Sequence, residues 1–417
     1  MKTNPVLPLA GEFPALGRKF GGRKMIYLDS ACTALKLRPA AEAQKAFLLD
    51  LGGCGGSRSS HALARAVEEK CSAARAAAAE FTGAAGPGEI IFTSGTTEAA
   101  NMFAGAFPFT PARNEVILSP LEHNSVFLPF HELSKTGKIK LRIIPLKGLK
   151  PDLAAFGRML GRRTALVCAA RASNFFGGVT DFGRLAAMAR SAGAAVFFDD
   201  AQYAPTHAVR AAESGADALA FSGHKLGAPF GTGVLWVKKG TLAGLKPFKT
   251  GGGMVKSVAR SGRGFKAGYL DDYQRFEAGI QNYAGAIGLA EAFKVIKAAG
   301  PEAVRAHMRM LLRRAFSALS GFRRIRILGE AADLERGAML SFVPVKNAFA
   351  PADLNIFLNS YFKDRFFAVR TGRHCADLAS LMSGIRETVR ISFFLHTSKS
   401  DIDAFAEALE QYFSFLK

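Results

Sequence analysis

The stretch with the clearest chemical potential is Ala220-Phe221-Ser222-Gly223-His224-Lys225, which ends on a single lysine. The apolar run before it is typical of a buried strand, and the small residues predict a loop that presents Lys225 at the strand end. An ε-amine condenses with an aldehyde only when it is neutral, and burial or nearby charge can lower the pKa of a lysine. A surface lysine after a strand has the same local pattern, so the other reactive residues must decide.

A phosphate cradle is predicted where the apolar run at 89–92 meets a turn rich in glycine and threonine. Gly95, Thr96 and Thr97 stand there, at the expected start of a helix. Backbone N–H groups at a helix N-terminus, together with two hydroxyls, favour a phosphate group. Ordinary N-capping by a threonine is the alternative interpretation.

Two carboxylates end a further apolar run at 195–198. Asp199 or Asp200 beside a pyridine nitrogen would keep that nitrogen protonated, so that the ring of pyridoxal phosphate (PLP) can accept electrons from a carbanion. Two adjacent acids at a strand end can instead bind a metal ion. With Lys225 as the amine that forms the Schiff base, these groups together favour a PLP site.

His123 follows the apolar run at 115–118, so it is expected at the carboxyl end of a strand, where open α/β sheets place ligands. Its ring can stack on a cofactor and move protons. A helix-capping or core histidine fits the same pattern.

A thiol and an arginine near the C-terminus complete the candidate site. Cys375 lies in a polar loop flanked by His374, Arg373 and Arg370, and positive neighbours favour the reactive thiolate. Arg390 stands in an otherwise apolar strand, where a guanidinium needs an anion: a substrate carboxylate, or an acidic side chain of the protein. The other four cysteines, which show no CxxC spacing, are expected to be non-functional thiols; they are Cys32, Cys54, Cys71 and Cys168.

The elements that position these residues alternate between apolar strands and helices. Strands are expected at 89–92, 115–118, 142–145, 164–170, 195–198, 216–221 and 233–237, with helices at 38–51 and 63–81. This is the pattern of βαβ units in a parallel sheet. The region around Gly251-Gly252-Gly253 is expected to be a loop. After Asn282 a helix at 284–299 leads into a mixed α+β region with strands near 325–328, 338–343, 366–370 and 388–394, and helices at 351–360 and from Ser400.

Composition sets the outer limits. The chain has 417 residues, 49% of them hydrophobic, which is enough for a large core and two or three domains. We find no apolar run of 18 residues and no export-signal pattern in residues 1–20, so a cytoplasmic enzyme is expected. The formal charge of +21 is spread along the chain without a nucleic-acid-binding motif, so no specific nucleic acid and no membrane partner are expected.

Taken together, these residues resemble the class V aminotransferase superfamily and, within it, the cysteine desulfurases of the Suf type, which are related to selenocysteine lyases. The most specific blocks are Ser222-Gly223-His224-Lys225, Arg275-Phe276-Glu277-Ala278-Gly279, and Arg370-Thr371-Gly372 with His374-Cys375. The resemblance implies an α/β PLP-dependent transferase fold of type I. It would have a large domain (23–284) with a mostly parallel seven-stranded sheet, a small α+β domain (285–417), and an N-terminal segment (1–22) packed on the small domain.

The resemblance also implies a role for each candidate. Asp199, rather than Asp200, would meet the pyridine nitrogen, with Gln202 near the phenolic oxygen and His123 stacked on the ring. Asn174 would contact cofactor and substrate. The phosphate would be held by Gly95, Thr96, Thr97, Ser222 and His224. Arg390 would bind the substrate carboxylate together with Arg370, and Cys375 would take the substrate sulfur.

The implied reaction converts L-cysteine to L-alanine and leaves a persulfide on Cys375, which passes its sulfur to an acceptor protein, for instance in iron–sulfur cluster assembly. Lys225 would remove the Cα proton. A homodimer is expected, because sites in this family form between subunits. A selenocysteine lyase would use the same residues, an epimerase or aminotransferase would not need Cys375, and a non-catalytic scaffold would not need the cofactor.

Three positions depart from the family pattern. Arg373 stands where relatives usually have a second histidine, and Ile280 where many have a threonine that reaches a phosphate across a dimer interface. The segment 55–61 only loosely matches the family's His-Arg loop, and no role is assigned to it.

Overall fold

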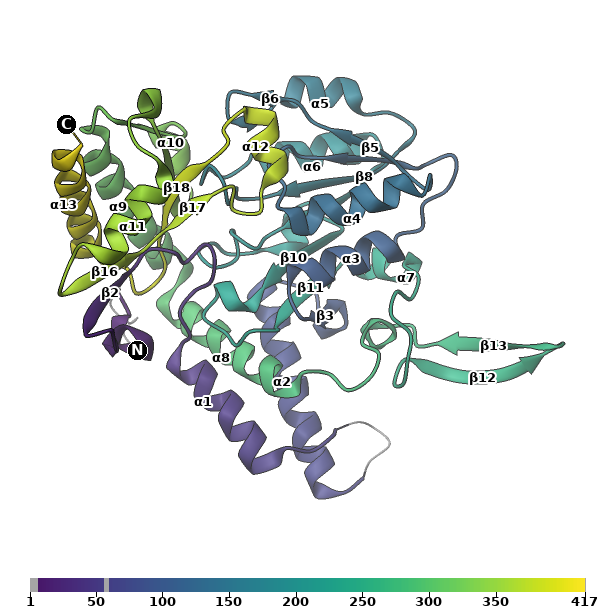
Figure 1. The fold of residues 1–417 in the computed structure, drawn as a ribbon. Coiled ribbons are helices and arrows are strands. Elements are labelled where there is room, and N and C mark those ends of the chain that lie inside the picture. Colours follow the sequence, from purple (N-terminus) through teal and green to yellow (C-terminus); the bar gives the residue numbers. More distant parts are fainter. Residues whose placement is uncertain (1–6, 56–59, 417) are drawn as a thin grey trace.

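The computed structural model describes residues 7–55 and 60–416, so most of the loosely matching loop at 55–61 lies outside the described residues. Its largest sheet has seven strands in the order β3-β11-β10-β9-β8-β4-β5 (Figure 1). Only β11 runs antiparallel to its neighbours. The predicted α/β architecture with a mostly parallel seven-stranded sheet is confirmed.

The strands of this sheet, apart from the edge strand β5 with its alternating exposed and half-buried residues, are largely buried runs of β-branched, aromatic and small residues, as expected for a sheet covered on both faces. They are β3 (Ile90–Thr93), β4 (Glu115–Leu118), β5 (Lys140–Ile143), β8 (Thr164–Ala170), β9 (Ala195–Asp199), β10 (Ala218–Ser222) and β11 (Gly233–Val237). The helices connecting or covering them are α2 (Ala62–Thr82), α3 (Thr96–Ala106), α4 (Asn124–Lys135), α5 (Leu153–Met159), α6 (Phe182–Ser191), α7 (Lys239–Gly244) and α8 (Tyr283–Ala299). Each predicted strand is present to within two residues at either end.

Helix α1 (Arg38–Ala46) is shorter than the predicted helix at 38–51. Its last turn continues as a π-helical segment, Phe47–Leu51, which ends at Gly52 with φ of 51°. A left-handed residue of this kind is a common helix stop, and glycine adopts it without steric cost. Two short strands, β6 (Leu146–Lys147) and β7 (Lys150–Pro151), form a hairpin between β5 and α5.

The C-terminal part is a four-stranded sheet in the order β14-β15-β18-β17, with helices against it. Its strands are β14 (Ile325–Ile327), β15 (Met339–Pro344), β17 (Arg370–Gly372) and β18 (Thr388–Ser392), and its helices are α9 (Pro301–Ser320), α10 (Ala331–Leu334), α11 (Pro351–Ser360), α12 (Asp377–Ser383) and α13 (Lys399–Phe415). Helix α13 begins with a capping box in which Ser398 and Asp401 satisfy each other's backbone N–H groups.

The N-terminal strands belong with this second part. β2 (Arg23–Tyr27) pairs with β1 (Lys19–Phe20) on one side and in parallel with β16 (Arg365–Ala368) on the other. The chain therefore crosses to the large sheet only after Tyr27. We propose that the boundary of the N-terminal segment lies there rather than at residue 22.

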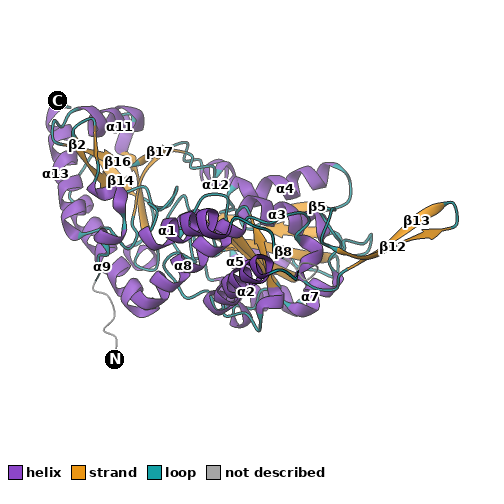
Figure 2. Cartoon of the chain, turned by 90° about the horizontal axis from the view of Figure 1, so that it is seen from below, coloured by secondary structure: helices purple, strands orange, loops and turns teal. Residues whose placement is uncertain are grey.

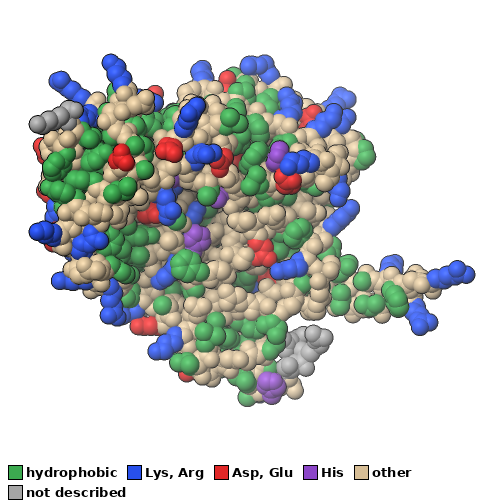
Figure 3. All heavy atoms as spheres, viewed as in Figure 1, with side chains coloured by type: hydrophobic (Ala, Val, Ile, Leu, Met, Phe, Trp, Pro, Cys, Tyr) green, Lys and Arg blue, Asp and Glu red, His purple; other side chains and the backbone are tan. Residues whose placement is uncertain are grey.

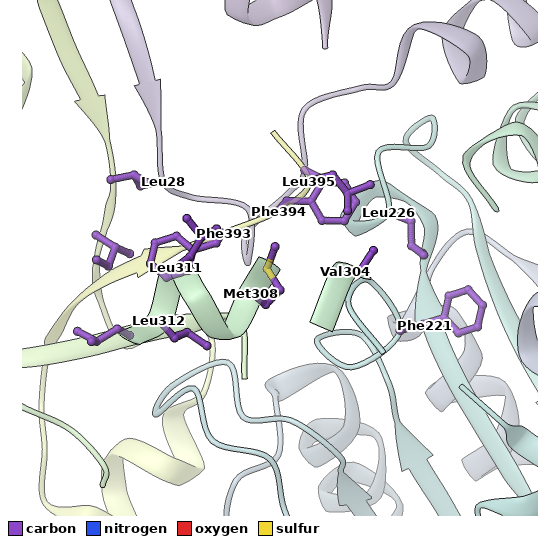
Figure 4. Close-up of a cluster of buried hydrophobic side chains, with 14 of the residues drawn as sticks. Leu28, Phe221, Leu226, Val304, Met308, Leu311, Leu312, Phe393, Phe394 and Leu395 are labelled. Atoms are coloured by element: carbon purple, nitrogen blue, oxygen red, sulfur yellow. The ribbon is translucent and has the colours of Figure 1, made fainter. Parts of the chain in front are cut away.

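A continuous core joins the two parts. Figure 4 shows Val304, Met308 and Leu311 of α9 beside Phe394 and Leu395, with Leu226 and Phe221 of the large part nearby. All are less than 10% exposed. Apolar contact of this kind fixes the relative position of the two sheets, and thereby of the residues at their edges.

The structure also contains a hairpin that the sequence did not indicate. β12 (Val255–Ser261) and β13 (Gly264–Tyr269) follow the predicted glycine loop and project from the body in both ribbon views (Figures 1 and 2). Val258 and Phe265 are exposed on it. Because most residues of the hairpin are exposed, its strands lack the apolar alternation that identifies a half-buried strand.

Lys and Arg side chains are scattered over the visible face rather than gathered in one patch, and several lie on the hairpin (Figure 3). Among the described residues, no helix is long and apolar enough to cross a membrane.

Candidate active site

A cavity of about 190 Å³ opens at the carboxyl ends of the parallel strands, between the large sheet and the C-terminal part. It is lined by Ala31, Cys32, Thr96, Thr97, His123, Ser125, Asn174, Asp199, Ala201, Ser222, His224, Lys225, Arg370, His374, Cys375 and Arg390. Eleven of the thirteen predicted site residues are therefore brought together, from segments up to 294 positions apart. The two others, Gly95 and Gln202, lie directly behind lining residues.

Lys225 follows β10 in a short 3-10 turn, Gly223–Lys225, as the apolar run predicted. Burial lowers the pKa of its amine; Arg390 lowers it further, whereas Asp199 opposes the shift. At a given pH, a larger fraction of the Lys225 amine is therefore neutral than in a solvated lysine.

Asp199 and Asp200, which the local pattern alone left open and of which the family resemblance favoured Asp199, have different surroundings. The Asp199 carboxylate accepts a hydrogen bond from the backbone N–H of Ala201 at 2.8 Å and faces the cavity. Burial raises the pKa of Asp199 to about 6, and Lys225 opposes that rise. Asp200 is fully buried and ion-paired with Arg171. Among the described residues, no three or more carboxylate, histidine or cysteine side chains form a cluster that could hold a metal ion.

The hydroxyl groups gather at the N-terminus of α3. Ser222 Oγ accepts a hydrogen bond from the Thr96 N–H at 2.8 Å and lies 2.9 Å from Thr96 Oγ1. Thr97 Oγ1 lies 2.7 Å from Ser125 Oγ. Gly95 precedes the helix with φ of 150°, and a Cβ there would lie 3.1 Å from Ser222 Oγ. The close approach requires glycine.

His123 combines the two roles that its position suggested. Its Nδ1 accepts the N–H of Ser125 at 3.0 Å and so caps α4, while its ring lines the cavity. Burial lowers its pKa to about 3, with Lys225 and Arg390 adding to the effect. The ring is therefore neutral near pH 7, and with Nδ1 occupied as an acceptor it carries its proton on Nε2.

The loop that carries Cys375 is held by hydrogen bonds from the large part of the chain. The Asn124 N–H donates to the Cys375 carbonyl at 2.8 Å, and Asn174 Nδ2 donates to the His374 carbonyl at 2.7 Å. His374 and Cys375 both have φ of 54°, a left-handed conformation that is unfavourable for side chains with a Cβ. These hydrogen bonds keep the exposed thiol over the cavity.

The expected set of positive neighbours around Cys375 is partly wrong. Burial lowers the pKa of His374 to about 2, with Arg390 and Arg370 contributing, so its imidazole is neutral. Arg373 forms an ion pair with Asp377 at 2.9 Å. Arg370 is also ion-paired, with Asp29 at 2.7 Å. The local sequence does not show which of the three flanking residues become buried or paired.

Asp29, which the sequence analysis did not single out, organises the arginines. Its Oδ2 accepts from Arg370 Nη2 at 2.7 Å, and its Oδ1 accepts from Arg390 Nη2 at 3.3 Å. Arg390 is 2% exposed, donates to the Asn174 carbonyl at 2.8 Å, and has no partner for its Nε among the described residues. Arg390 therefore forms the intraprotein salt bridge and also keeps an N–H donor that could bind a substrate carboxylate. Asp29 closes the apolar stretch Met25-Ile26-Tyr27-Leu28, and its position at the end of an apolar run could have indicated it.

Other predicted residues lie outside the cavity wall. Gln202 Nε2 donates to the carbonyl of Ala31, so it supports the wall. Glu277 of the Arg275–Gly279 block pairs with Arg75 at 2.7 Å and thereby joins α2 to β3. Ile280 is 76% exposed. Cys168 is buried within β8, as expected, whereas Cys32 lines the cavity and is a residue that the sequence analysis missed.

The donor set fits an aromatic aldehyde that carries a phosphate. One end has hydroxyls at a helix N-terminus, the middle has a half-buried lysine facing a buried carboxylate, and the other end has Arg390 with an unused donor. The Gly95 backbone leaves room where any side chain would crowd Ser222. These features match the groups of pyridoxal phosphate and of an amino-acid carboxylate.

Comparisons with known proteins agree with this geometry. A family model described as aminotransferase class-V matches residues 26–405. A cysteine desulfurase of Dickeya dadantii is 32% identical over 98% of this chain and 96% of its own. A probable cysteine desulfurase of Halobacterium salinarum is 32% identical over 96% of this chain and 94% of its own.

Solved structures give the same result. The crystal structure of the cysteine desulfurase CsdA from Escherichia coli matches with a TM-score of 0.86 and 30% identity, covering 98% of each chain. The apo structure of a cysteine desulfurase from Thermococcus onnurineus matches with a TM-score of 0.84 and 29% identity, covering 93% of this chain and 94% of that one.

Proposed function

Because the chain belongs to the class-V aminotransferase family, we propose that it is a PLP-dependent cysteine desulfurase, which converts L-cysteine to L-alanine and holds the sulfur on Cys375. The observation that carries the proposal is that Lys225 and Cys375 line one cavity. An amine and a thiol that line the same cavity suit a reaction that first activates an amino acid at its α-carbon and then removes its sulfur.

The cofactor would be held by residues at three places in the cavity. Gly95, Thr96, Thr97, Ser222 and His224 would bind the phosphate, Asp199 would hold the proton of the ring nitrogen, and Gln202, Asn174 and His123 would contact the remaining edges and face. When bound there, pyridoxal phosphate supplies an electron sink for the α-carbon of the amino acid.

The substrate carboxylate would be bound by Arg390, whose free Nε leaves a donor for it, with Arg370 beside it. Asp29 and the Asn174 carbonyl fix the Arg390 guanidinium before substrate arrives, so little side-chain entropy is lost on binding. Lys225, whose pKa burial lowers, then acts as the base that removes the Cα proton.

Cys375 would attack the substrate sulfur as a thiolate and keep it as a persulfide. The thiol is exposed at the mouth of the cavity, so the bound sulfur can be reached from solvent. We therefore propose that a sulfur-acceptor protein collects it. A homodimer is part of the proposal, and sedimentation of the holoenzyme tests that part.

The test of the function is alanine and sulfide production from L-cysteine with a thiol reductant, comparing wild type with Cys375→Ala. The expected result is turnover by wild type, and loss of desulfuration in the variant while the visible cofactor band near about 420 nm remains. Equal activity of both proteins would exclude the role of Cys375 in sulfur transfer. Inert proteins that still carry the band would exclude a desulfurase and leave an epimerase or aminotransferase. A protein that binds no cofactor would be a scaffold.

Selenium is the second candidate. A selenocysteine lyase uses the same residues, so the ratio of kcat/KM for L-selenocysteine and L-cysteine distinguishes the two activities.

A further inference from the structure

A second thiol shares the cavity with Cys375. Cys32 follows β2 and Asp29, at the point where the chain crosses from the C-terminal part to the large part. Its side chain lines the cavity, as does that of Cys375. Arg370 Nη2 donates to Cys32 Sγ at 2.7 Å, and Arg370 itself lines the cavity. The sulfur of Cys32 is thus held on the wall rather than turned into the core.

Arg370 and Asp29 link the chain segments that carry the two thiols. Arg370 begins β17, and this strand leads directly into the turn that carries Cys375. Arg370 is itself fixed by Asp29, three residues before Cys32, through a hydrogen bond of 2.7 Å. The same carboxylate therefore positions the arginine that holds Cys32 and, through β17, the base of the Cys375 loop.

The remaining three cysteines do not share this arrangement. Cys168 is buried in β8, Cys71 lies on α2, and Cys54 is exposed in the loop after Leu51. None of them lines the cavity. Cys54 is therefore a matched control, an accessible thiol of the same chain outside the site.

We propose that Cys32 is a second sulfur nucleophile of the site, which attacks the persulfide on Cys375 and closes an internal disulfide when no acceptor collects the sulfur. The inference rests on the proposed desulfurase function, because that function supplies the persulfide. It assigns to Cys32 a role that neither the sequence nor the comparisons suggest.

The step is balanced without an added oxidant. The Cys32 sulfur attacks Cys375 Sγ, a new S–S bond forms between the two cysteines, and the bond from Cys375 Sγ to the outer sulfur breaks. The electron pair of that bond leaves with the outer sulfur, which departs as hydrogen sulfide with its own proton and the proton of Cys32. Relative to the persulfide, the Cys32 sulfur is oxidised by one electron, the outer sulfur is reduced by one electron, and the oxidation state of the Cys375 sulfur does not change.

The consequence is a limit on sulfur release. An enzyme that has lost its acceptor would release one sulfide, stop with Cys32 and Cys375 joined, and resume only after a thiol reductant opens the disulfide. Thiolate attack on a persulfide follows the same displacement chemistry as disulfide exchange. Because Cys375 is exposed, an acceptor that docks there would take the outer sulfur before Cys32 displaces it.

The experiment is a single turnover of the holoenzyme with L-cysteine under anaerobic conditions, without reductant or acceptor, for wild type, Cys32→Ser and Cys54→Ser. Alanine, sulfide and the intact mass of the chain are measured together. Wild type and Cys54→Ser are expected to give one sulfide per alanine and a chain lighter by two hydrogens, with peptides containing residues 32 and 375 linked. Cys32→Ser is expected to give alanine without sulfide and a chain heavier by one sulfur atom.

Two controls make the outcome decisive. Wild type kept without L-cysteine must show no disulfide, which excludes air oxidation, and Cys375→Ala must show neither product. A wild-type chain that keeps the added sulfur, with no linked peptide, overturns the role of Cys32 while leaving the desulfurase intact. Absence of alanine from every variant means instead that the proposed function itself has failed.

Discussion

The Arg171 guanidinium and the Asp200 carboxylate form a buried ion pair directly behind Asp199. Arg171 Nε donates to Asp200 Oδ1 at 2.5 Å, and its Nη2 donates to the second oxygen. Arg171 and Asp200 are 1% and 0% exposed. The backbone N–H of Arg171 also donates to the backbone carbonyl of Asp199 at 3.0 Å. One of two adjacent buried carboxylates is thereby neutralised, and the other is left to face the cavity.

Removing Arg171 and removing Asp200 should shift the pKa of Asp199 in opposite directions. Arg171→Met leaves the Asp200 charge unbalanced, and repulsion between the two carboxylates should raise the pKa of Asp199 above about 6. Asp200→Asn leaves Arg171 unpaired and should lower it. The measurement is the pH titration of the ring nitrogen in holoenzyme reconstituted with ¹⁵N-labelled pyridoxal phosphate.

The double variant Arg171→Met, Asp200→Asn is the control for folding. Each single change is expected to cost about 3–5 kcal/mol of unfolding free energy, because it leaves a buried charge without a partner, and the double change less. Titration shifts of the same sign in both single variants would show that the pair acts only through packing.

Gly95→Ala should weaken cofactor binding. The backbone φ of 150° is unfavourable for alanine, and the new Cβ would lie 3.1 Å from Ser222 Oγ. Strain of about 1–3 kcal/mol predicts a roughly tenfold or greater rise in the dissociation constant of the cofactor. Gly86→Ala is the matched control, because φ there is −178° and nothing lies within 4 Å of the added atom. Equal cofactor affinities of the two variants would contradict a role for Gly95 in the phosphate-binding turn.

Arg390→Lys should raise KM for L-cysteine and lower kcat/KM by about 10- to 100-fold, because a charged hydrogen bond to the carboxylate is lost. Steady-state kinetics measure the effect, and the visible cofactor band is expected to persist. Arg386→Lys, an exposed neighbour on the same segment, serves as the control. A variant with unchanged KM would show that the carboxylate binds elsewhere.

The buried histidines should make the protein less stable in acid. Burial lowers the pKa of His396 from 6.5 to about 4. The unfolded chain therefore binds a proton that the folded chain excludes, so the stabilisation is complete above about pH 6.5 and is lost as pH falls towards 4. The loss at this one group is about 3 kcal/mol.

Denaturant unfolding at several pH values between 4 and 7 tests this linkage. His396→Gln should reduce the slope of unfolding free energy against pH by up to about 1.4 kcal/mol per pH unit. The same replacement at His131, a half-buried residue of α4, serves as the control. An unaltered slope for His396→Gln would mean that this ring is protonated in the folded state.

Much of the fold follows from local patterns. The apolar runs that became β3, β4 and β8 to β10 are typical of buried parallel strands, and β9 and β10 end on Asp199 and Ser222, which line the cavity. That is why Lys225, His123 and Asp199 could be singled out: parallel strands present their carboxyl ends at one edge, so residues just after such runs lie together.

What the sequence left open depended on contacts between distant segments. The local pattern contained two acids, and the family resemblance favoured Asp199; the physical reason is the pairing of Asp200 with Arg171, which lies 29 positions before it. The sequence could not show that Asp29 joins Arg370 to Arg390, or that Cys32 faces the same cavity as Cys375. Residue types and strand periodicity are local properties, whereas pairing of charges and exposure of a thiol depend on which segments the tertiary fold packs together.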